Sequence, residues 1–322
     1  MMGILVIRSG LLTTIQDLGR FGFQKDGVIV SGVMDSFAHR VANILVGNAE
    51  TEATIEMTMI GPILKFEEDA QIAICGGEFE VNLDGEEVSF WRPIYVQKGS
   101  TLTINQCQKG CRAYLAVAGG YQIPNVMNSQ STYLLAKVGG LNGRAIQKGD
   151  TIPLRETSKK SSHQKNFGVS HTLRNYFGGS ERDIRVIRGD DFNDFTEQSQ
   201  NQFFHQSYEI TTQSNRMGYR LDGYPLIRKV QKEMVSSAVT FGTIQVPSEG
   251  KPIILMVDRQ TTGGYPKIAQ VAAVDLPTLA QMRPGERITF QEISFKEAQQ
   301  LFVAREKEIQ LLKKQIFFQA EV

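Results

Sequence analysis

Residues 253–274 read IILMVDRQTTGGYPKIAQVAAV, an apolar run, a polar loop and a second apolar run. The short runs Ile253–Val257 and Ile268–Val274, separated by glycine and proline, predict two strands. A connection between strands needs only a Gly or a Pro and some polar residues, whereas this loop carries Arg, Gln, two Thr, two Gly, Tyr, Pro and Lys without a break. The loop is therefore either a hairpin whose hydroxyls bond its own backbone or a ligand-binding segment.

Short strands ended by glycine recur along most of the chain. Ala53–Gly61 and Asp69–Gly77 are apolar stretches of this kind, and Glu78–Phe90 alternates around Asp84-Gly85, a dipeptide favoured in tight hairpins. Many short strands with Gly turns indicate a mainly β protein, and a barrel or sandwich rather than a doubly wound sheet.

Two segments predict helices. In Met34–Asn48 apolar residues recur with helical spacing, and Gly47 stands where a C-terminal cap would be. Residues 294–318 repeat apolar residues in the same way after a candidate Ser cap. The apolar stripe of this C-terminal helix covers either the body of the protein or a partner.

A weak internal repeat predicts two β modules in tandem. IGPILKF (60–66) followed by QIAIC resembles FGTIQVP (241–247) followed by IILMV. The polar stretch 155–166 has nothing apolar to bury and predicts a linker. We therefore expect an N-terminal β module over 1–157, a second over 167–293, and a C-terminal helix over 294–322.

Composition excludes several classes of function. The 322 residues include 35 Lys+Arg and 34 Asp+Glu, which gives no electrostatic reason to expect nucleic acid or an anionic membrane as partner. No run approaches the length of a membrane helix, and the N-terminus does not resemble a secretory signal. Three cysteines, Cys75, Cys107 and Cys111, fit a reducing cytoplasm, and with four scattered histidines they predict no metal site.

Known catalytic motifs are also absent from the sequence. It has no G-x-x-x-x-G-K-[ST] for an ATP-binding P-loop and no G-x-S-x-G elbow. No Lys lies between two methionines in an Ala-Met-Lys-Met context, so no biotin is expected on this chain.

Three segments are denser in polar groups than a barrel needs: 13–27, 211–223 and the loop 258–268. Each combines an arginine, an amide or hydroxyl, and a glycine next to an aromatic. Arginine can hold a carboxylate or phosphate through two parallel hydrogen bonds, and glycine lets backbone N–H groups approach a ligand. The candidate binding residues are Arg20, Asn215, Arg216, Arg259, Gln260, Thr261, Thr262, Gly263, Gly264 and Tyr265.

Two residues are candidates for catalysis. Lys267 would add positive charge at the end of the loop 258–268. Asp17 could serve as a base, although aspartate is also a usual turn and cap residue. The residues 215–218 could likewise form a simple turn, with Arg220 and Asp222 as a surface pair.

The chain resembles the biotin-dependent carboxyltransferase-related family, which includes the C-type subunit of 5-oxoprolinase, the KipA-like proteins and the allophanate hydrolase subunit 2-like proteins. The matching segments run from Leu12 to about Val274: TTIQDLGRFGFQ, SGVMDSFAHRVANILVGN, RAYLAVAGG, QSNRMGYRL, FGTIQVPSEGKPI and DRQTTGGYPKIAQV. The resemblance implies a cyclophilin-like β-barrel in each half. It also implies a complex with a B-type (KipI-like) subunit and an A-type (LamB/YcsF-like) subunit.

The resemblance further implies that this complex cleaves 5-oxoproline to glutamate with ATP as co-substrate and Mg²⁺. An interface between subunits is a candidate place for the ATP, and the subunit that binds it stays open. On this interpretation Arg259 and Arg216 clamp the carboxylate of a small amide substrate, and Lys267 with the Gly263 and Gly264 amides stabilises an oxyanion or phosphate. Two alternatives stay open. One is a KipA-like regulator that neutralises a B-type inhibitor of a sporulation kinase. The other is a carboxyltransferase-type subunit of a urea or allophanate pathway.

Overall fold

The computed structural model describes residues 3–156, 167–179, 181–230 and 233–321, and packing divides the chain into two compact units. Unit 1 comprises Met1–Arg20, Ser31–Gly178 and Glu308–Val322, and unit 2 comprises Phe21–Val30 and Gly179–Lys307. The predicted modules are continuous, whereas these packing units are discontinuous, so the module boundaries stay a prediction. Most of the predicted linker lies outside the described residues.

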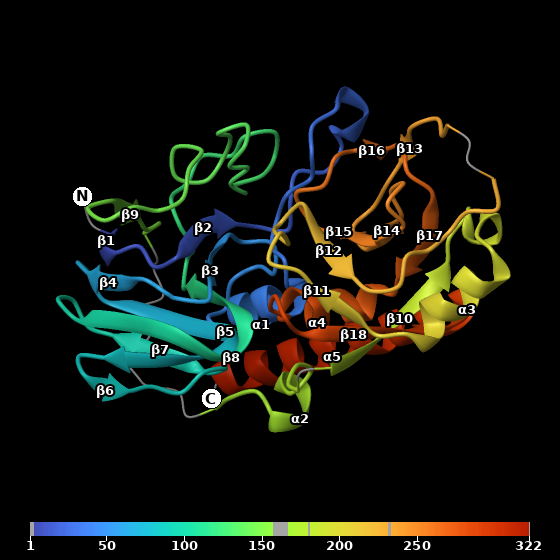
Figure 1. Cartoon of the computed structure of the whole chain (residues 1–322). Helices are drawn as coiled ribbons and strands as arrows, with labels where there is room; N and C mark the ends of the chain where they lie inside the picture. Colours follow the sequence, from blue (N-terminus) through green and yellow to red (C-terminus); the bar gives the residue numbers. More distant parts are fainter. Residues whose placement is uncertain (1–2, 157–166, 180, 231–232, 322) are drawn as a thin grey trace. The chain divides into compact units, whose positions relative to one another are not determined.

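Unit 1 is built on a nine-stranded sheet that curls into a half-barrel (Figure 1). Its strands are β1 (Gly3–Arg8), β2 (Leu12–Gln16), β3 (Thr54–Thr58), β4 (Ile63–Phe66), β5 (Ala70–Leu83), β6 (Glu86–Glu87), β7 (Pro93–Val96), β8 (Thr101–Val117) and β9 (Thr151–Pro153). The order β2-β3-β8-β4-β1-β9 forms one path, and β5 pairs with β6, β7 and β8. Its helices are α1 (Ser36–Leu45) and α2 (His171–Arg174).

The centre of this sheet is buried on both faces, which explains why its strands are apolar without strict alternation. Ile72 and Leu115 belong to the core on one face, whereas Cys75 and Tyr114 belong to a second core on the other face, beneath α1. The predicted helix at 34–48 is confirmed as α1, and Gly47 follows it with φ +75°. Gly47 thus has the left-handed conformation that a helix C-terminus favours.

The predicted hairpin around Asp84-Gly85 is also confirmed. Leu83 pairs with Glu86, and Asp84 and Gly85 both have positive φ (53° and 92°), as a two-residue turn of this type requires.

Unit 2 is a closed barrel in which the strands follow the order β10-β17-β14-β15-β12-β11-β18. These strands are β10 (Glu181–Arg188), β11 (Tyr208–Ile210), β12 (Gly218–Asp222), β14 (Thr243–Gln245), β15 (Ile253–Leu255), β17 (Lys267–Val271) and β18 (Arg287–Glu292). A separate pair consists of β13 (Ser237–Ala238) and β16 (Thr262–Gly263). The short helices are η1 (Gln24–Asp26), η2 (Phe192–Asp194), α3 (Glu197–His205), η3 (Ala273–Asp275) and α4 (Leu276–Ala280).

The mainly β fold is therefore confirmed, with one difference between the halves: unit 2 closes into a barrel and unit 1 does not. The internal repeat also pairs differently in its two copies. In unit 2, β14 pairs with β15, whereas in unit 1 β4 pairs with β1 and β8, and β5 pairs with β8. Strands of similar sequence in the two units therefore pair with different neighbouring strands.

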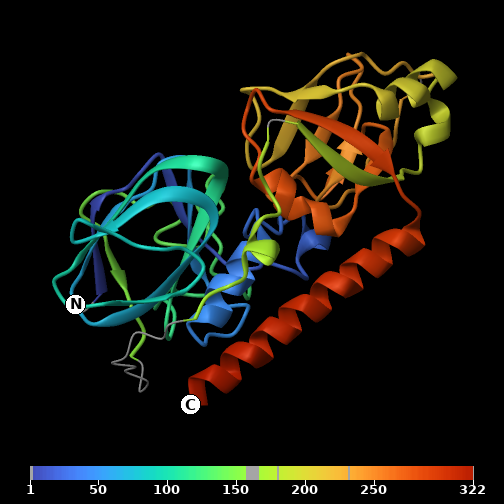
Figure 2. The same ribbon diagram turned by 90° about the horizontal axis from the view of Figure 1, so that it is seen from below.

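The C-terminal helix α5 (Phe295–Glu321) is one long helix that leaves β18 (Figure 2). The predicted Ser cap is confirmed, because the Ser294 hydroxyl accepts the N–H of Glu297 at 3.2 Å and the Glu297 carboxylate accepts the N–H of Ser294 at 2.7 Å. In the second half of the apolar stripe, Ile309 is buried in unit 1, whereas Phe302 in the first half is exposed. Among the described residues, no helix has the length and apolarity to cross a membrane.

Candidate functional site

The loop 258–266 crosses over a strand and does not turn a hairpin. β15 and β17 both pair antiparallel with β14, which lies between them, so they run parallel to each other and their connection must cross a face of the sheet. On the way, Thr262 and Gly263 form β16 and pair with β13. The hairpin alternative is therefore wrong. The middle of the loop is held in place by its pairing with β13.

Beneath this loop lies a cavity of about 200 Å³. Five of the predicted binding residues line it: Asn215, Arg259, Gln260, Thr262 and Tyr265. The other lining residues are Met217, Gly218, Arg220, Val239, Gln245, Ile253 and Leu255. The lining contains two arginines and no carboxylate, so the cavity is suited to an anion with some apolar surface.

Strand alternation places this cavity on the outer face of the barrel wall. Across the pairing of β12, β15 and β14, Arg220 is opposite Ile253, which is opposite Gln245. The neighbours in register, Tyr219 and Ile254, are 2% and 0% exposed, and they point to the barrel interior. The site is thus a floor of three strands roofed by the loop 258–266.

Arg259 has the properties of an anion-binding residue. Its half-buried guanidinium makes only long hydrogen bonds to backbone carbonyls, at 3.3 Å to Met256 and 3.5 Å to Val239, and it binds no carboxylate in the part of the chain that the structure describes. Loss of solvent lowers the pKa of Arg259 to about 10, and the nearby charge of Asp258 opposes this shift. Arg259 is therefore charged at neutral pH and incompletely solvated.

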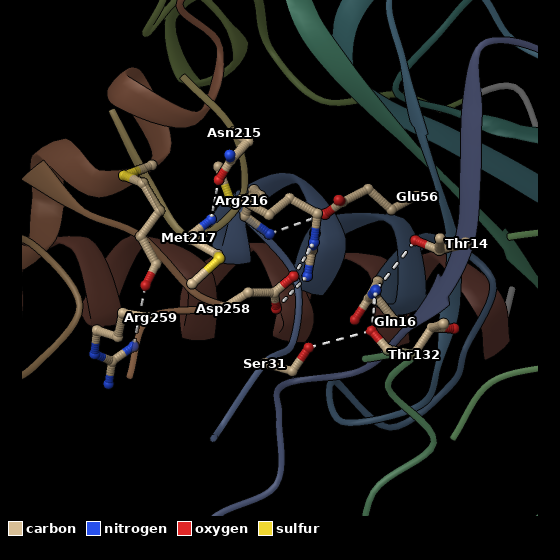
Figure 3. A network of polar contacts seen from close by, with 12 residues as sticks. Thr14, Gln16, Ser31, Glu56, Thr132, Asn215, Arg216, Met217, Asp258 and Arg259 are labelled. Carbon is tan, nitrogen blue, oxygen red and sulfur yellow. Dashed lines mark hydrogen bonds and ion pairs between the residues drawn. The ribbon is translucent and has the colours of Figure 1, made fainter. Parts of the chain in front are cut away.

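Arg216 is used differently from the predicted clamp (Figure 3). Its Nε donates to Asp258 Oδ2 at 2.9 Å and its Nη2 to Asp258 Oδ1 at 3.2 Å, and both side chains are 7% exposed. The N–H of Asp258 also donates to the Arg216 carbonyl at 2.8 Å. This bidentate pair fastens the start of the loop 258–266 to the turn before β12.

Asn215 shapes that same turn. Its Oδ1 accepts the N–H of Met217 at 2.8 Å, which is the local bond that asparagine favours in turns (Figure 3). The side chain therefore supports the cavity wall that Met217 and Gly218 complete.

Arg220 is a site residue that sequence reasoning missed. The sequence suggested a surface pair of Arg220 with Asp222, but Asp222 pairs with Lys251 instead. Gly218 and Arg220 are two apart on β12, so they share a face of the strand, and both line the cavity that Arg259 also lines.

The remaining residues of the loop are distributed around the cavity. Thr261 accepts the N–H of Val239 through its carbonyl at 3.2 Å, and Gly264 lines a neighbouring cavity of about 350 Å³ that shares Tyr265. Lys267 is not among the lining residues of either cavity, and its Nζ lies 3.5 Å from Asp190 Oδ2. The structure thus does not bring Lys267 to the cavity.

Asp17 and Arg20 belong to unit 1, where both hold the segment 126–131. The Asp17 carboxylate accepts hydrogen bonds from Gly19 N (2.8 Å), Ser129 Oγ (2.7 Å), Gln130 N (2.6 Å) and Ser131 Oγ (2.5 Å). Arg20 is 1% exposed and donates to the carbonyls of Val126 at 3.1 Å and Ser131 at 2.8 Å. A carboxylate with four donors and a fully buried guanidinium have structural roles in this unit.

Unit 1 also contains buried polar groups that the sequence did not reveal. The Tyr114 hydroxyl donates to Glu56 at 2.9 Å and accepts the N–H of Asp35 at 2.8 Å, and Asp35 caps α1 through Ala38. Burial raises the pKa of Tyr114 well above its ordinary value. Gln16, next to Asp17 in the sequence, donates to Thr14 and to the Thr132 carbonyl, which also accepts from Ser31 (Figure 3).

The chain combines a curled β sheet with a closed β barrel, and the barrel carries an arginine-lined cavity under the loop 258–266. Residues 26–292 match the family described as carboxyltransferase domain, subdomain A and B, and the chain belongs to that family.

Two relatives that bear the name of the C-type subunit of 5-oxoprolinase match nearly the full length of the chain. The Escherichia coli protein is 40% identical over 91% of this chain and 92% of its own length. The Haemophilus influenzae protein is 40% identical over 97% of this chain and 96% of its own.

The crystal structure of K. lactis urea amidolyase has the same fold over 95% of this chain, with a TM-score of 0.90 and 30% identity. This chain spans only 20% of that protein. The relationship therefore concerns one segment of a much longer enzyme.

Proposed function

We propose that this protein is the C-type subunit of an ATP-dependent 5-oxoprolinase complex, which opens the lactam ring of 5-oxoproline to give glutamate. The observation that carries the proposal is the 40% identity to two proteins of that name over 92% and 96% of their own lengths. The match covers nearly all of this chain and of both relatives, so it is not confined to one shared domain.

The cavity in unit 2 is the proposed place for the substrate. Its volume of about 200 Å³ suits a five-membered ring, and Ile253 and Leu255 offer apolar surface to the ring carbons. Arg259, supported by Arg220 on the cavity floor, would bind the carboxylate through charge-assisted hydrogen bonds. Each such bond is worth about 1.5–3 kcal/mol.

The chain holds and orients the substrate in this proposal, and its partners complete the reaction centre. Thr262 and the Gly263 and Gly264 amides stay candidates for binding the oxygen that gains charge during ring opening. Lys267 and Asp17 remain the predicted catalytic residues. Their positions beside Asp190 and the segment 126–131 give them structural partners instead of a place at the cavity.

ATP and Mg²⁺ are assigned to the partner subunits or to an interface with them. The cavity lining contains no carboxylate for Mg²⁺, and about 200 Å³ is small for a nucleoside triphosphate. This cavity therefore does not fit an ATP–Mg²⁺ complex. The proposed partners are the A-type and B-type subunits, and the proposed location is the cytoplasm.

Reconstitution tests the proposal directly. This chain is purified with its B-type neighbour, the A-type subunit is added, and phosphate release is measured with 5-oxoproline and ATP. We expect turnover that disappears when this chain is left out. A tight, well-folded complex without turnover would contradict the proposal and favour the regulatory alternative.

Carboxyl transfer is a second candidate function, favoured by the TM-score of 0.90 to K. lactis urea amidolyase. It requires a biotin carrier outside these 322 residues, because they contain no biotin-attachment motif. Transfer of a carboxyl group from carboxybiotin to urea, measured with such a carrier supplied, would distinguish it from lactam opening.

A further inference from the structure

Gln245 is a buried polar residue on the floor of the cavity. It ends β14, lines the cavity and is 4% exposed. On the cavity floor it follows Arg220 and Ile253 across three neighbouring strands, which lie about 4.8 Å apart.

The orientation of the Gln245 carboxamide is determined by the loop above it. Its Nε2 donates to the Tyr265 carbonyl at 3.2 Å, and this bond distinguishes the amide nitrogen from the oxygen. The carboxamide lies in space that only a glycine leaves open, because a Cβ on Gly263 would be 2.4 Å from Nε2 and 2.9 Å from Oε1. The carboxamide therefore lies against the loop, held by this hydrogen bond and beside Gly263.

Oε1 of Gln245 is left as an acceptor. It has no hydrogen-bond partner within the described residues, although the side chain is more than nine-tenths buried. A ligand that brings a donor into this cavity gains a hydrogen bond to this oxygen. The arginines of the cavity supply donors only, so a complementary ligand combines an anionic group with an N–H.

We propose that Gln245 is a specificity-determining residue that recognises the N–H of a cyclic amide, while Arg259 and Arg220 bind the carboxylate of the same ligand. This inference rests on the proposed function and deepens it, because 5-oxoproline carries a ring N–H next to the carbon that bears its carboxylate. Oε1 accepts that N–H, and Nε2 stays bound to the loop.

The test compares two ligands that differ only in this N–H. In 3-oxocyclopentane-1-carboxylate a CH₂ group replaces the ring N–H of 5-oxoproline, and both the ketone and the carboxylate are retained. The reconstituted complex is titrated with each ligand by calorimetry, and their affinities are compared. In the wild-type complex we expect the lactam to bind on the order of 10-fold more tightly than the carbocycle.

Gln245→Met, which keeps the length of the side chain and removes the acceptor, should reduce this ratio to about 1. Gly263→Ala should reduce it as well, because its Cβ displaces the carboxamide while Gln245 remains. Gln270→Met is the matched control. The Gln270 amide also bonds a backbone carbonyl, at 2.8 Å to Phe241, but its oxygen is used by Thr240 and Thr243. This variant should retain the wild-type ratio.

The outcomes separate the two levels of the proposal. An unchanged ratio in Gln245→Met, or an equal fall in Gln270→Met, would overturn the role of Gln245, while turnover of 5-oxoproline by the wild-type complex would leave the proposed function standing. A wild-type complex that binds neither ligand and turns nothing over would overturn both.

Discussion

His39 makes the stability of unit 1 depend on pH in a direction that can be calculated. It lies in α1 with 0% exposure, its Nδ1 is 2.9 Å from Thr54 Oγ1, and its Nε2 has no hydrogen-bond partner within the described residues. Burial lowers its pKa from 6.5 to about 4, with Asp17 and the Glu50 backbone raising it and Arg40 lowering it to a smaller extent. The folded protein therefore holds His39 neutral.

The sign and the size follow from linkage. The pKa is lower in the folded state, so the unfolded chain binds a proton first as the pH falls below 6.5. Between pH 7 and pH 5 this difference costs unit 1 about 2 kcal/mol of its free energy of unfolding. The loss continues until the pH reaches the folded value of about 4.

Trp91 provides the assay, because it is the single tryptophan of the chain and is buried in the same unit as His39. Urea unfolding is followed by its fluorescence at pH 7, 6 and 5 for the wild type and for His39→Gln, which cannot take up a proton. We expect the wild type to lose about 2 kcal/mol more than His39→Gln over this range.

His171→Gln is the matched control, since His171 is exposed in α2, and this variant should keep the wild-type dependence on pH. Equal losses in the wild type and in His39→Gln would refute the reasoning, because the pH dependence would then come from other groups.

Three further predictions concern the site and α5. Arg259→Ala should reduce kcat/KM for 5-oxoproline by about 10- to 150-fold with unchanged circular dichroism. The control Arg188→Ala, which removes a surface ion pair with Glu292, should have little effect on kcat/KM. Normal turnover by Arg259→Ala would exclude Arg259 as the residue that binds the substrate carboxylate. Asp258→Ala, which removes a bidentate partner from buried Arg216, should lower the free energy of unfolding of unit 2 by about 3–5 kcal/mol in urea titrations, and a loss below about 1 kcal/mol would contradict this role. Ser294→Ala should cost about 1 kcal/mol through the lost cap of α5, measured by thermal unfolding, and an unchanged melting temperature would count against it.

Local signals predicted much of this fold. The period of 34–48 and the capping box at Ser294 depend on residues three or four apart, and the Asp84-Gly85 turn depends on two neighbours. Such interactions are complete within one short segment, so the sequence alone shows them. The strands predicted in 253–257 and 268–274 were found for the same reason, since the sequence around each is a short apolar run.

The pairing of the strands could not be predicted in this way. The two copies of the internal repeat look alike, yet β14 pairs with β15 whereas β4 and β5 do not pair with each other. Strand order is determined by segments far away in the sequence, and β8 alone contacts β3, β4 and β5. The crossover of the loop 258–266, and with it the cavity, follows from that order.

The arginines show why site residues were predicted only in part. Arg20, Arg216 and Arg259 stand in similar polar segments, but Arg20 binds backbone carbonyls, Arg216 binds Asp258, and Arg259 binds no carboxylate in the described part of the chain. A guanidinium that is already paired would have to give up that bond to bind a substrate carboxylate, whereas one that lines a cavity with only long carbonyl bonds gains from it. The partner, which lies 42 residues away in the case of Arg216, decides the role of each arginine. For that reason the proposed substrate site depends on Arg259, with Arg220 on the floor of the same cavity.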